Sequence, residues 1–170
     1  MSDLSYIKFF TPIGEMLLAS EGSSLCGAWF MGQKYFPAME GWGMEGWEER
    51  ENELFDTATF ELARYFMGQL QRFTVSLRPR GTPFQQKVWS SIAEIPYGRA
   101  ASYEELAKRL GSSPRAVGAA TGRNPLSIFI PCHRVVGSGG DLTGYAGGLK
   151  KKEALLKLEG VEVKDGKALN

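Results

Sequence analysis

The chain has 170 residues, of which 43% are hydrophobic and 23% charged, and its formal net charge at pH 7 is +1. These proportions are those of an ordinary globular protein and exclude a disordered or fibrous chain. No apolar run approaches the length of a membrane span, and the first residues lack a basic stretch leading into an apolar core. We therefore expect no membrane partner, no secretory signal and a cytoplasmic location, where thiols stay reduced.

Charge is divided unevenly along the chain. Residues 1–80 hold 7 basic and 11 acidic side chains, whereas residues 81–170 hold 13 basic and 8 acidic ones. A basic second half is compatible with a polyanionic partner, although so small an excess does not identify one. The run Arg78-Pro79-Arg80-Gly81 has the composition of a linker, so we expect two domains, 1–80 and 81–170.

The first domain is expected to be an antiparallel sheet with one helix. Apolar, aromatic and β-branched residues over 6–10, 15–20 and 25–31 predict three strands separated by turns. Residues 33–49 have no clear period and are expected to form a loop. Apolar positions recur through 52–67 as on one face of a helix, and a further strand is expected at 73–77. The aromatic residues of this half indicate a core, and none suggests a catalytic site.

The second domain is expected to be mainly helical. Thr82-Pro83-Phe84-Gln85 and Ser102-Tyr103-Glu104-Glu105 both have the pattern of a capping box, in which the first and fourth residues bond each other's backbone. Helices are therefore predicted to begin at both places, and the second is expected to extend through Leu110.

A helix-turn-helix is predicted around Gly111. This glycine ends the second helix, and Ser113-Pro114 supplies the cap and first turn of a third helix over 115–122. This third helix carries small residues, and Arg115 is its one long side chain. The small residues fit either close packing against a neighbouring helix or a surface that approaches the minor groove of DNA.

The candidates for reactive chemistry are Cys132 and the chain's only histidine, His133, which come directly after the apolar run 126–131. The thiolate is the nucleophilic form of cysteine, and a nearby base or cation increases its population. Adjacent residues of a strand point to opposite faces, so contact between this pair requires a turn or helix to begin here. Cys26 offers a disulfide partner, but two cysteines are weak support for a disulfide. With one histidine, no zinc-binding spacing is present.

Two further segments lie beyond the cysteine. Residues 137–148 contain six glycines together with a leucine and a tyrosine, which favours a structured binding loop over a flexible linker. The helix expected at 149–158 begins with three lysines and is followed by Glu159, an order that opposes the helix dipole. We expect most of the lysines to be solvated and Glu159 to have a partner, for which His133 is the candidate.

Three runs carry a resemblance to the O6-alkylguanine-DNA alkyltransferases: Pro131-Cys132-His133-Arg134-Val135, Arg115-Ala116-Val117-Gly118 and Tyr145-Ala146-Gly147-Gly148-Leu149. The match covers residues 82–160, and the first half resembles that family's variable domain only loosely. The resemblance implies an α/β (α+β) chain with a ribonuclease-H-like first domain and a helical, winged-helix-like second domain containing the helix-turn-helix.

The resemblance also implies a function, direct-reversal DNA repair. The O6-alkyl group of guanine, with the O4-alkyl group of thymine as a second candidate, would pass irreversibly to Cys132 after the base is flipped out through the minor groove. Each molecule would act once, as a methylated-DNA–protein-cysteine methyltransferase. The implied partner is alkylated double-stranded DNA, with no membrane, no cofactor, no metal and no obligatory protein partner, and the chain is expected to be a monomer.

The family's site residues carry over by position. Cys132 is the acceptor, His133 a base acting through water, Glu159 its orienting carboxylate and Tyr103 the proton donor to the leaving base. Asn124 braces the helix-turn-helix against the active-site segment. The DNA-binding residues are expected to be Arg115, which fills the gap left by the flipped nucleotide, Ala116, Gly118, Ala119, Ala120 and Arg123. The pocket residues are expected to be Val135, Ser138, Tyr145, Ala146, Gly147 and Ser127.

Two positions depart from some family members. Ala146 stands where some members have a serine, and Ser127 where some have a proline.

Two other classes of protein stay open. A non-catalytic alkyltransferase-like protein would carry another residue, typically tryptophan, in place of Cys132, so this cysteine favours repair. A cysteine hydrolase or redox protein would need an oxyanion arrangement or a resolving thiol, and the sequence indicates neither.

Overall fold

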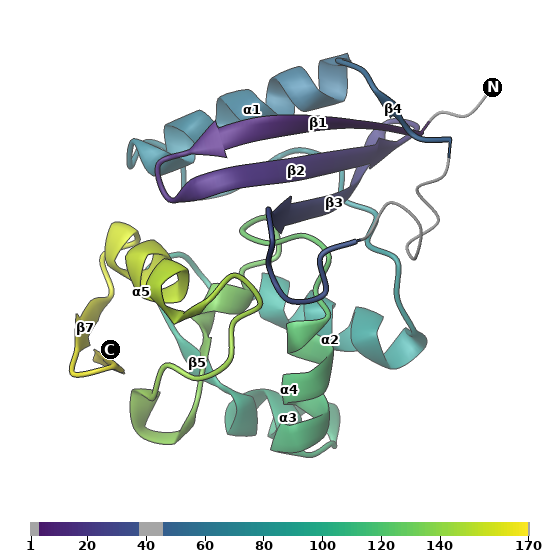
Figure 1. Cartoon of the computed structure of the whole chain (residues 1–170). Helices are drawn as coiled ribbons and strands as arrows, with labels where there is room; N and C mark the ends of the chain where they lie inside the picture. Colours follow the sequence, from purple (N-terminus) through teal and green to yellow (C-terminus); the bar gives the residue numbers. More distant parts are fainter. Residues whose placement is uncertain (1–3, 38–45, 170) are drawn as a thin grey trace.

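The computed structural model describes residues 4–37 and 46–169. Its first half holds a four-stranded sheet in the order β3-β2-β1-β4. Strands β1 (Leu4–Thr11), β2 (Gly14–Glu21) and β3 (Ser24–Phe30) are antiparallel neighbours, and β4 (Glu48–Glu49) pairs with β1 in parallel. Helix α1 (Glu53–Phe66) runs along one face of this sheet, and the β3 edge lies toward the second half of the chain (Figure 1).

Residues of β2 alternate between the two faces of the sheet, as strand geometry requires. Met16 and Leu18 pack in the core cluster that contains Leu62 of α1. On the other face, Leu17 packs in a second cluster with Trp47. Trp47 and β4 belong to the segment predicted as a loop, so that prediction was wrong at its end; residues 38–45 of it lie outside the described residues.

The second half begins with three capped helices, α2 (Pro83–Ala93), α3 (Tyr103–Leu110) and α4 (Pro114–Gly122). Thr82 forms the predicted capping box with Gln85. Ser102 accepts a hydrogen bond from the backbone N–H of Glu105, but within the described chain the reciprocal bond from the Glu105 side chain is absent, so this start is a simple N-cap. Ser102 is also the last residue of strand β5 (Ala101–Ser102), which pairs with β6 (Val135–Val136). Its backbone therefore takes part in a sheet as well as in the start of α3.

Helices α3 and α4 form the predicted helix-turn-helix. Gly111 ends α3 with a φ of 62°, a left-handed conformation that favours glycine. Ser113 caps α4 by accepting a hydrogen bond from the backbone N–H of Ala116. The indole Nε1 of Trp89 on α2 donates to the carbonyl oxygen of Ala120 at 2.8 Å, which fixes α4 against α2.

The outer edge of β3 pairs with one segment from each half of the chain. Its Leu25 bridges Leu77 in parallel, and its Ala28 bridges Leu126 in parallel. The predicted strand at 73–77 is therefore reduced to a single bridge. Cys26 lies at a register shift between β2 and β3, a bulge that falls between the two bridge positions, Leu25 and Ala28.

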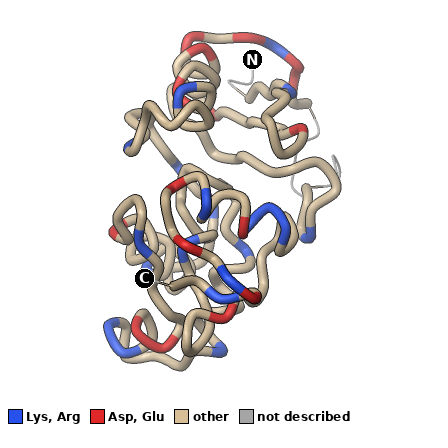
Figure 2. Tube along the Cα trace, turned by 90° about the vertical axis from the view of Figure 1, so that its left-hand side faces the viewer, with Lys and Arg blue, Asp and Glu red and all other residues tan. Residues whose placement is uncertain are grey.

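The rest of the second half follows Leu126 in the chain. It comprises the 3-10 helices η1 (Cys132–Arg134) and η2 (Ser138–Gly140), helix α5 (Leu149–Leu158) and the hairpin β7 (Glu162–Lys164) and β8 (Lys167–Leu169). One core cluster contains residues of both halves. Figure 2 shows most lysine and arginine segments in the second half, the lower part of the trace. Within the described residues, no helix is long and apolar enough to cross a membrane.

Candidate active site

A tight turn delivers the cysteine to the centre of the second half. The backbone N–H of Ile130 donates to the carbonyl oxygen of Leu126 at 2.9 Å, so the chain doubles back before Cys132. Ile128 at the turn has a φ of 75°, which β-branched residues rarely adopt. Cys132 is the first residue of η1. A helical turn therefore begins at the cysteine, which is the condition that the sequence set for contact between Cys132 and His133.

The Cys132 thiol is buried, with an exposed fraction of 6%. Burial raises its pKa, because the charged thiolate loses hydration. Opposing that rise are a hydrogen bond from the Asn124 side chain, the positive charge of Lys152 and the backbone N–H groups of Cys132 and His133. The thiol is therefore protonated at rest, while groups that stabilise its thiolate already surround it.

Asn124 joins the end of α4 to this turn. Its side-chain nitrogen donates to the carbonyl oxygen of Ile130 at 2.9 Å, and its side-chain oxygen accepts from the backbone N–H of Leu126. The amide thus spans the loop that precedes the cysteine and also contacts the thiol. Bracing of the helix-turn-helix by Asn124 stays a prediction, and these are the contacts through which it would act.

The structure brings His133 and Glu159 together, as the sequence predicts. The Nε2 atom of His133 lies 2.7 Å from Oε2 of Glu159, and both side chains are fully buried. Burial lowers the pKa of His133, which keeps the imidazole neutral. Because Glu159 accepts, Nε2 carries the proton, and Nδ1 is an acceptor without a hydrogen-bond partner among the described residues.

Glu159, at the C-cap of α5, accepts hydrogen bonds from three side chains. Besides His133, Arg134 donates from Nε to Oε1 at 2.7 Å and from a terminal nitrogen to Oε2 at 3.0 Å. Tyr65 donates its hydroxyl to Oε2 at 2.6 Å. Burial alone would raise the pKa of Glu159, but the bonds and charges of its neighbours lower it below the ordinary value. The carboxylate is therefore ionised, and neither Arg134 nor Tyr65 was among the predicted site residues.

Lys152 is the main exception to the expectation of solvated lysines. Its side chain is fully buried, whereas Lys150 is exposed and Lys151 half-buried. The ammonium donates to the carbonyl oxygens of Val135, Thr143 and Gly144. Burial lowers its pKa to about 8, and the nearby Cys132 opposes that fall. Its helical spacing from Leu155 and Leu156, both buried, was the available sign that it faces inward.

Two tyrosines lie beside the cysteine. The hydroxyl of Tyr103 donates to the carbonyl oxygens of Thr143 and Gly144 in the glycine-rich loop. Burial, and the negative charge that Cys132 carries when it is ionised, raise the pKa of Tyr103 to about 12, and the same two causes raise the pKa of Tyr145. Tyr103, Tyr145 and Ala146 line a pocket of about 280 Å³ that α4 and the loop enclose.

The other predicted pocket residues differ in position. Ala146 lines the pocket, and its carbonyl accepts from the backbone N–H of Lys34 in the first half. Gly147 packs so close to the Tyr145 ring that a Cβ there would lie 2.8 Å from it. Val135 and Ser127 are buried and are not among the residues that line this pocket, and Ser138 is exposed on η2.

The predicted DNA-binding residues form most of one surface of α4. Arg115, Ala119 and Arg123 are exposed, whereas Ala116 and Gly118 are half-buried. The Arg123 guanidinium stacks 3.8 Å from the centre of the Tyr35 ring. Ala120 does not belong to this surface, because it is buried and its carbonyl binds Trp89.

The fold and the site together define a two-part α/β protein that places a buried cysteine, histidine and glutamate beside a helix-turn-helix. Two family models match the chain. The ribonuclease-like domain of 6-O-methylguanine DNA methyltransferase matches residues 4–79, and the DNA binding domain of the same family matches residues 83–161.

Individual relatives agree with these matches. The methylated-DNA–protein-cysteine methyltransferase of Methanosarcina acetivorans is 48% identical over 91% of this chain and 97% of its own length. The structure of a Mycobacterium tuberculosis O6-methylguanine methyltransferase is 43% identical, with a TM-score of 0.81 over 92% of each chain. A Mycobacterium tuberculosis relative solved in complex with DNA is 42% identical, with a TM-score of 0.82 over 91% of this chain and 92% of that one.

The chain therefore belongs to the 6-O-methylguanine DNA methyltransferase family, and its enzyme class is that of the methylated-DNA–protein-cysteine methyltransferases, which act in DNA repair. The family, the enzyme class and the mixed α/β fold predicted from the sequence are thereby confirmed.

Proposed function

We propose that the chain repairs O6-alkylguanine in double-stranded DNA by moving the alkyl group irreversibly to Cys132, once per molecule. The observation that carries the proposal is the buried Cys132 thiol, hydrogen-bonded by Asn124 and influenced by the charge of Lys152, next to a bonded His133–Glu159 pair. O4-alkylthymine is a second candidate substrate. The protein acts as a monomer, in the cytoplasm, because the reaction needs a reduced thiol and one molecule provides every residue named.

The first step is removal of the thiol proton. His133 is neutral and its Nδ1 has an open acceptor position, so it takes the proton from Cys132 through one water molecule. The ionised Glu159 holds the imidazole by Nε2 and stabilises the imidazolium that forms. The positive charge of Lys152 stabilises the thiolate left behind.

The second step is transfer of the alkyl group. The thiolate sulfur forms a bond to the alkyl carbon while the bond from that carbon to O6 breaks, and its electron pair moves into the guanine ring. Tyr103 donates its proton to a ring nitrogen and later recovers one from the imidazolium. The thiolate charge is one cause of the raised Tyr103 pKa, so Tyr103 becomes more acidic as that charge disappears. The thioether product cannot be hydrolysed by these groups, so the protein is consumed.

DNA contacts are proposed for the exposed surface of α4. Small side chains at Ala116, Gly118 and Ala119 allow close approach to a minor groove, while the exposed Arg115 enters the stack left by the flipped nucleotide. Arg123 adds a positive charge at the end of the helix. We also propose a boundary between domains 1–80 and 81–170, which the separate family matches at 4–79 and 83–161 support.

Intact-mass measurement tests the transfer. After incubation with duplex DNA containing one O6-methylguanine, we expect the protein to gain one methylene unit, mapped to Cys132. The variant Cys132→Ala should gain nothing, whereas Cys26→Ala should gain the unit, because burial raises the pKa of Cys26 to about 12 and keeps it unreactive. An unmodified wild-type protein with an intact thiol would contradict the proposal.

The role of Arg115 is tested by comparing two substrates. Arg115→Ala should slow transfer from duplex DNA about ten-fold or more and leave reaction with a free O6-alkylguanine base nearly unchanged, because flipping is needed only in the duplex. Arg109→Ala, which removes an exposed arginine from α3, is the matched control and should affect neither strongly. Equal losses on both substrates in Arg115→Ala would contradict this role.

A further inference from the structure

One donor to Glu159 comes from outside the second half of the chain. Tyr65 lies in the last turn of α1, on the sheet side of the first half, and its side chain is 1% exposed. Its hydroxyl donates to Oε2 of Glu159 at 2.6 Å, and Oε2 is the oxygen that faces Nε2 of His133 at 2.7 Å. The first half therefore touches the carboxylate that orients the imidazole.

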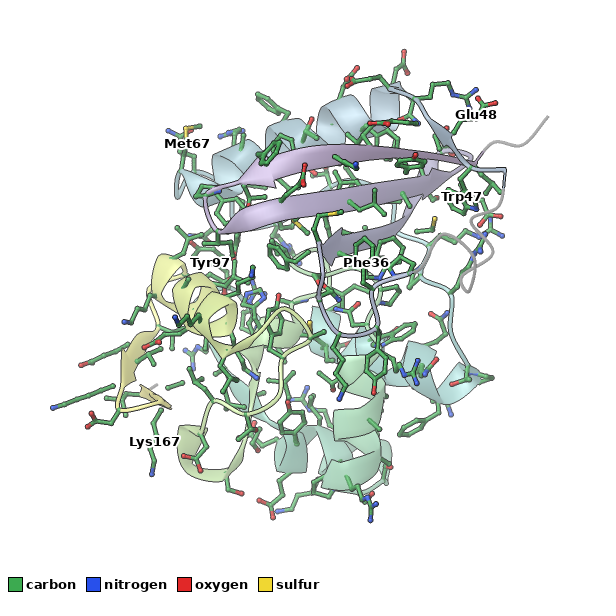
Figure 3. The ribbon with its side chains drawn as sticks, in the orientation of Figure 1. Phe36, Trp47, Glu48, Met67, Tyr97 and Lys167 are labelled. Atoms are coloured by element: carbon green, nitrogen blue, oxygen red, sulfur yellow. The ribbon has the colours of Figure 1, made fainter. Side chains whose placement is uncertain are left out.

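Aromatic packing fixes the Tyr65 ring in this place. Its ring centre lies 5.4 Å from that of Phe73 and 6.4 Å from that of Tyr97, with Tyr97 nearly perpendicular. Tyr97 comes after α2 in the chain and lies between the end of α1 and helix α5 (Figure 3). The Arg134 guanidinium lies 5.8 Å from the Tyr97 ring centre. The hydroxyl of Tyr65 is thus held toward Glu159 by its surroundings on both halves.

We propose that Tyr65 is a positioning residue for alkyl transfer, through which the first half of the chain sets the orientation and acceptor strength of Glu159 toward His133. This inference rests on the proposed function, in which His133 receives the Cys132 proton. It gives the first half a part in the chemistry, in addition to its packing role.

The physical basis is competition for one oxygen atom. Oε2 accepts from Tyr65, from His133 and, at 3.0 Å, from Arg134, so its negative charge is shared among three donors. Without the Tyr65 hydroxyl, Oε2 would interact more strongly with the imidazole, and the charged imidazolium would gain more than the neutral ring. Loss of the hydroxyl should therefore raise the pKa of His133.

Several other groups besides Tyr65 act on the His133–Glu159 pair. Burial lowers the pKa of His133, and the positive charges of Arg134 and Lys152 lower it further. The other titratable and charged groups near the pair come from four elements. They are Lys152 of α5, Cys132 and Arg134 of η1, Tyr97 of the turn after α2, and Tyr145 of the glycine-rich loop. A variant that removes only the Tyr65 hydroxyl therefore separates the effect of this hydroxyl on the pKa of His133 from the effects of the other groups.

The imidazole resonances provide a direct measurement, because His133 is the only histidine in the chain. Tyr65→Phe keeps the aromatic ring and removes only the hydroxyl. We expect the Nε2–H proton of this variant to move downfield at pH 7.5, and the pKa of His133 measured by nuclear magnetic resonance to rise by about 0.5 to 1 unit. The acid limb of the pH–rate profile for methyl transfer should move to higher pH by the same amount.

Two variants control for packing and for sign. Tyr97→Phe removes a hydroxyl from the same aromatic group, but that hydroxyl bonds the carbonyl oxygen of Leu158 rather than Glu159, so the His133 signals should not move. Glu159→Gln removes the carboxylate charge and should lower the pKa of His133. Imidazole signals that coincide in wild type and Tyr65→Phe, or that move equally in Tyr97→Phe, would overturn the inference.

The imidazole measurement needs no DNA, which separates this inference from the proposed function. If the wild type takes up no methyl group while Tyr65→Phe still shifts the imidazole signals, the proposed function fails and the coupling of Tyr65 to His133 stands. If the wild type takes up the group and the pH–rate profile of Tyr65→Phe matches it, the proposed function stands and the positioning role is wrong.

Discussion

Buried charged side chains hold one another in place around the thiol. Lys152 is different, because its acceptors among the described residues are three backbone carbonyl oxygens of the strand and loop that flank the pocket, and none is a carboxylate. A buried ammonium with only dipolar partners carries a large desolvation cost, which is why its pKa falls to about 8. Its position therefore serves the thiolate and the loop at the same time.

Replacing Lys152 with methionine should slow alkyl transfer. The variant keeps most of the side-chain volume but removes the positive charge that stabilises the Cys132 thiolate. We expect the transfer rate at pH 7.5 to fall about ten-fold or more, equivalent to at least about 1.4 kcal/mol. Single-turnover methyl uptake measures it, with Lys151→Met as the control because Lys151 is partly exposed on the same helix. Equal rates in Lys152→Met and wild type would exclude this electrostatic role.

The pH dependence of the free energy of unfolding should depend on the buried His133 and Glu159. The pKa of His133 is lowered in the folded chain, so between pH 7.5 and 5.5 the unfolded chain binds a proton that the folded chain does not. The free energy of unfolding in urea should therefore fall as the pH drops through about 6.5, and again below about 4.5 as unfolded Glu159 is protonated. His133→Asn should abolish the first fall, and an unchanged slope in that variant would contradict the assignment.

The sequence predicted the grouping of Cys132, His133 and Glu159 better than it predicted the residues around them. Cys132 and His133 are adjacent, and Glu159 stands at a helix end where an acid is unfavourable, so each could be found locally. Tyr65 could not, because its bond to Glu159 joins residues 94 positions apart. Lys152 is one of three consecutive lysines, a composition that predicts exposure to solvent. Only its helical spacing from buried leucines indicated that its side chain is buried.

Among the helices and strands, local patterns succeeded where the interaction was local. The starts of α2 and α4 depend on caps within three residues, and both were predicted correctly. Strand β4 and the bridge at Leu77 depend on distant partners, β1 and Leu25, so no local pattern could fix their lengths.

Two glycines in the helix-turn-helix should respond in opposite ways to alanine. Gly111 has a left-handed φ of 62° and no atom near its Cβ position, so Gly111→Ala should cost about 1 kcal/mol of stability from backbone strain alone. Gly122 lies in the last turn of α4 with similar open space, so Gly122→Ala should be neutral or stabilise by up to about 1 kcal/mol. Urea unfolding measures both, and losses of equal size would contradict the distinction.

Across the whole molecule, the two halves should unfold as one unit. The main core cluster includes residues of both, and the Leu126 segment pairs with the edge of β3. Circular dichroism and tryptophan emission should therefore give coincident transitions, since Trp29 lies in the first half and Trp89 in the second. Leu126→Ala should lower the free energy of unfolding by about 2–5 kcal/mol while the transitions stay coincident. Two separate transitions would show that the halves are independent.

The burial of Cys132 has a consequence for the protein's lifetime in a cell. In the proposed function each molecule reacts once, so an electrophile or oxidant that reached the Cys132 sulfur first would consume the protein. A thiol with an exposed fraction of 6% and a raised pKa is a poor target for them. Burial of this thiol would therefore protect the acceptor of the proposed reaction from unintended alkylation and oxidation.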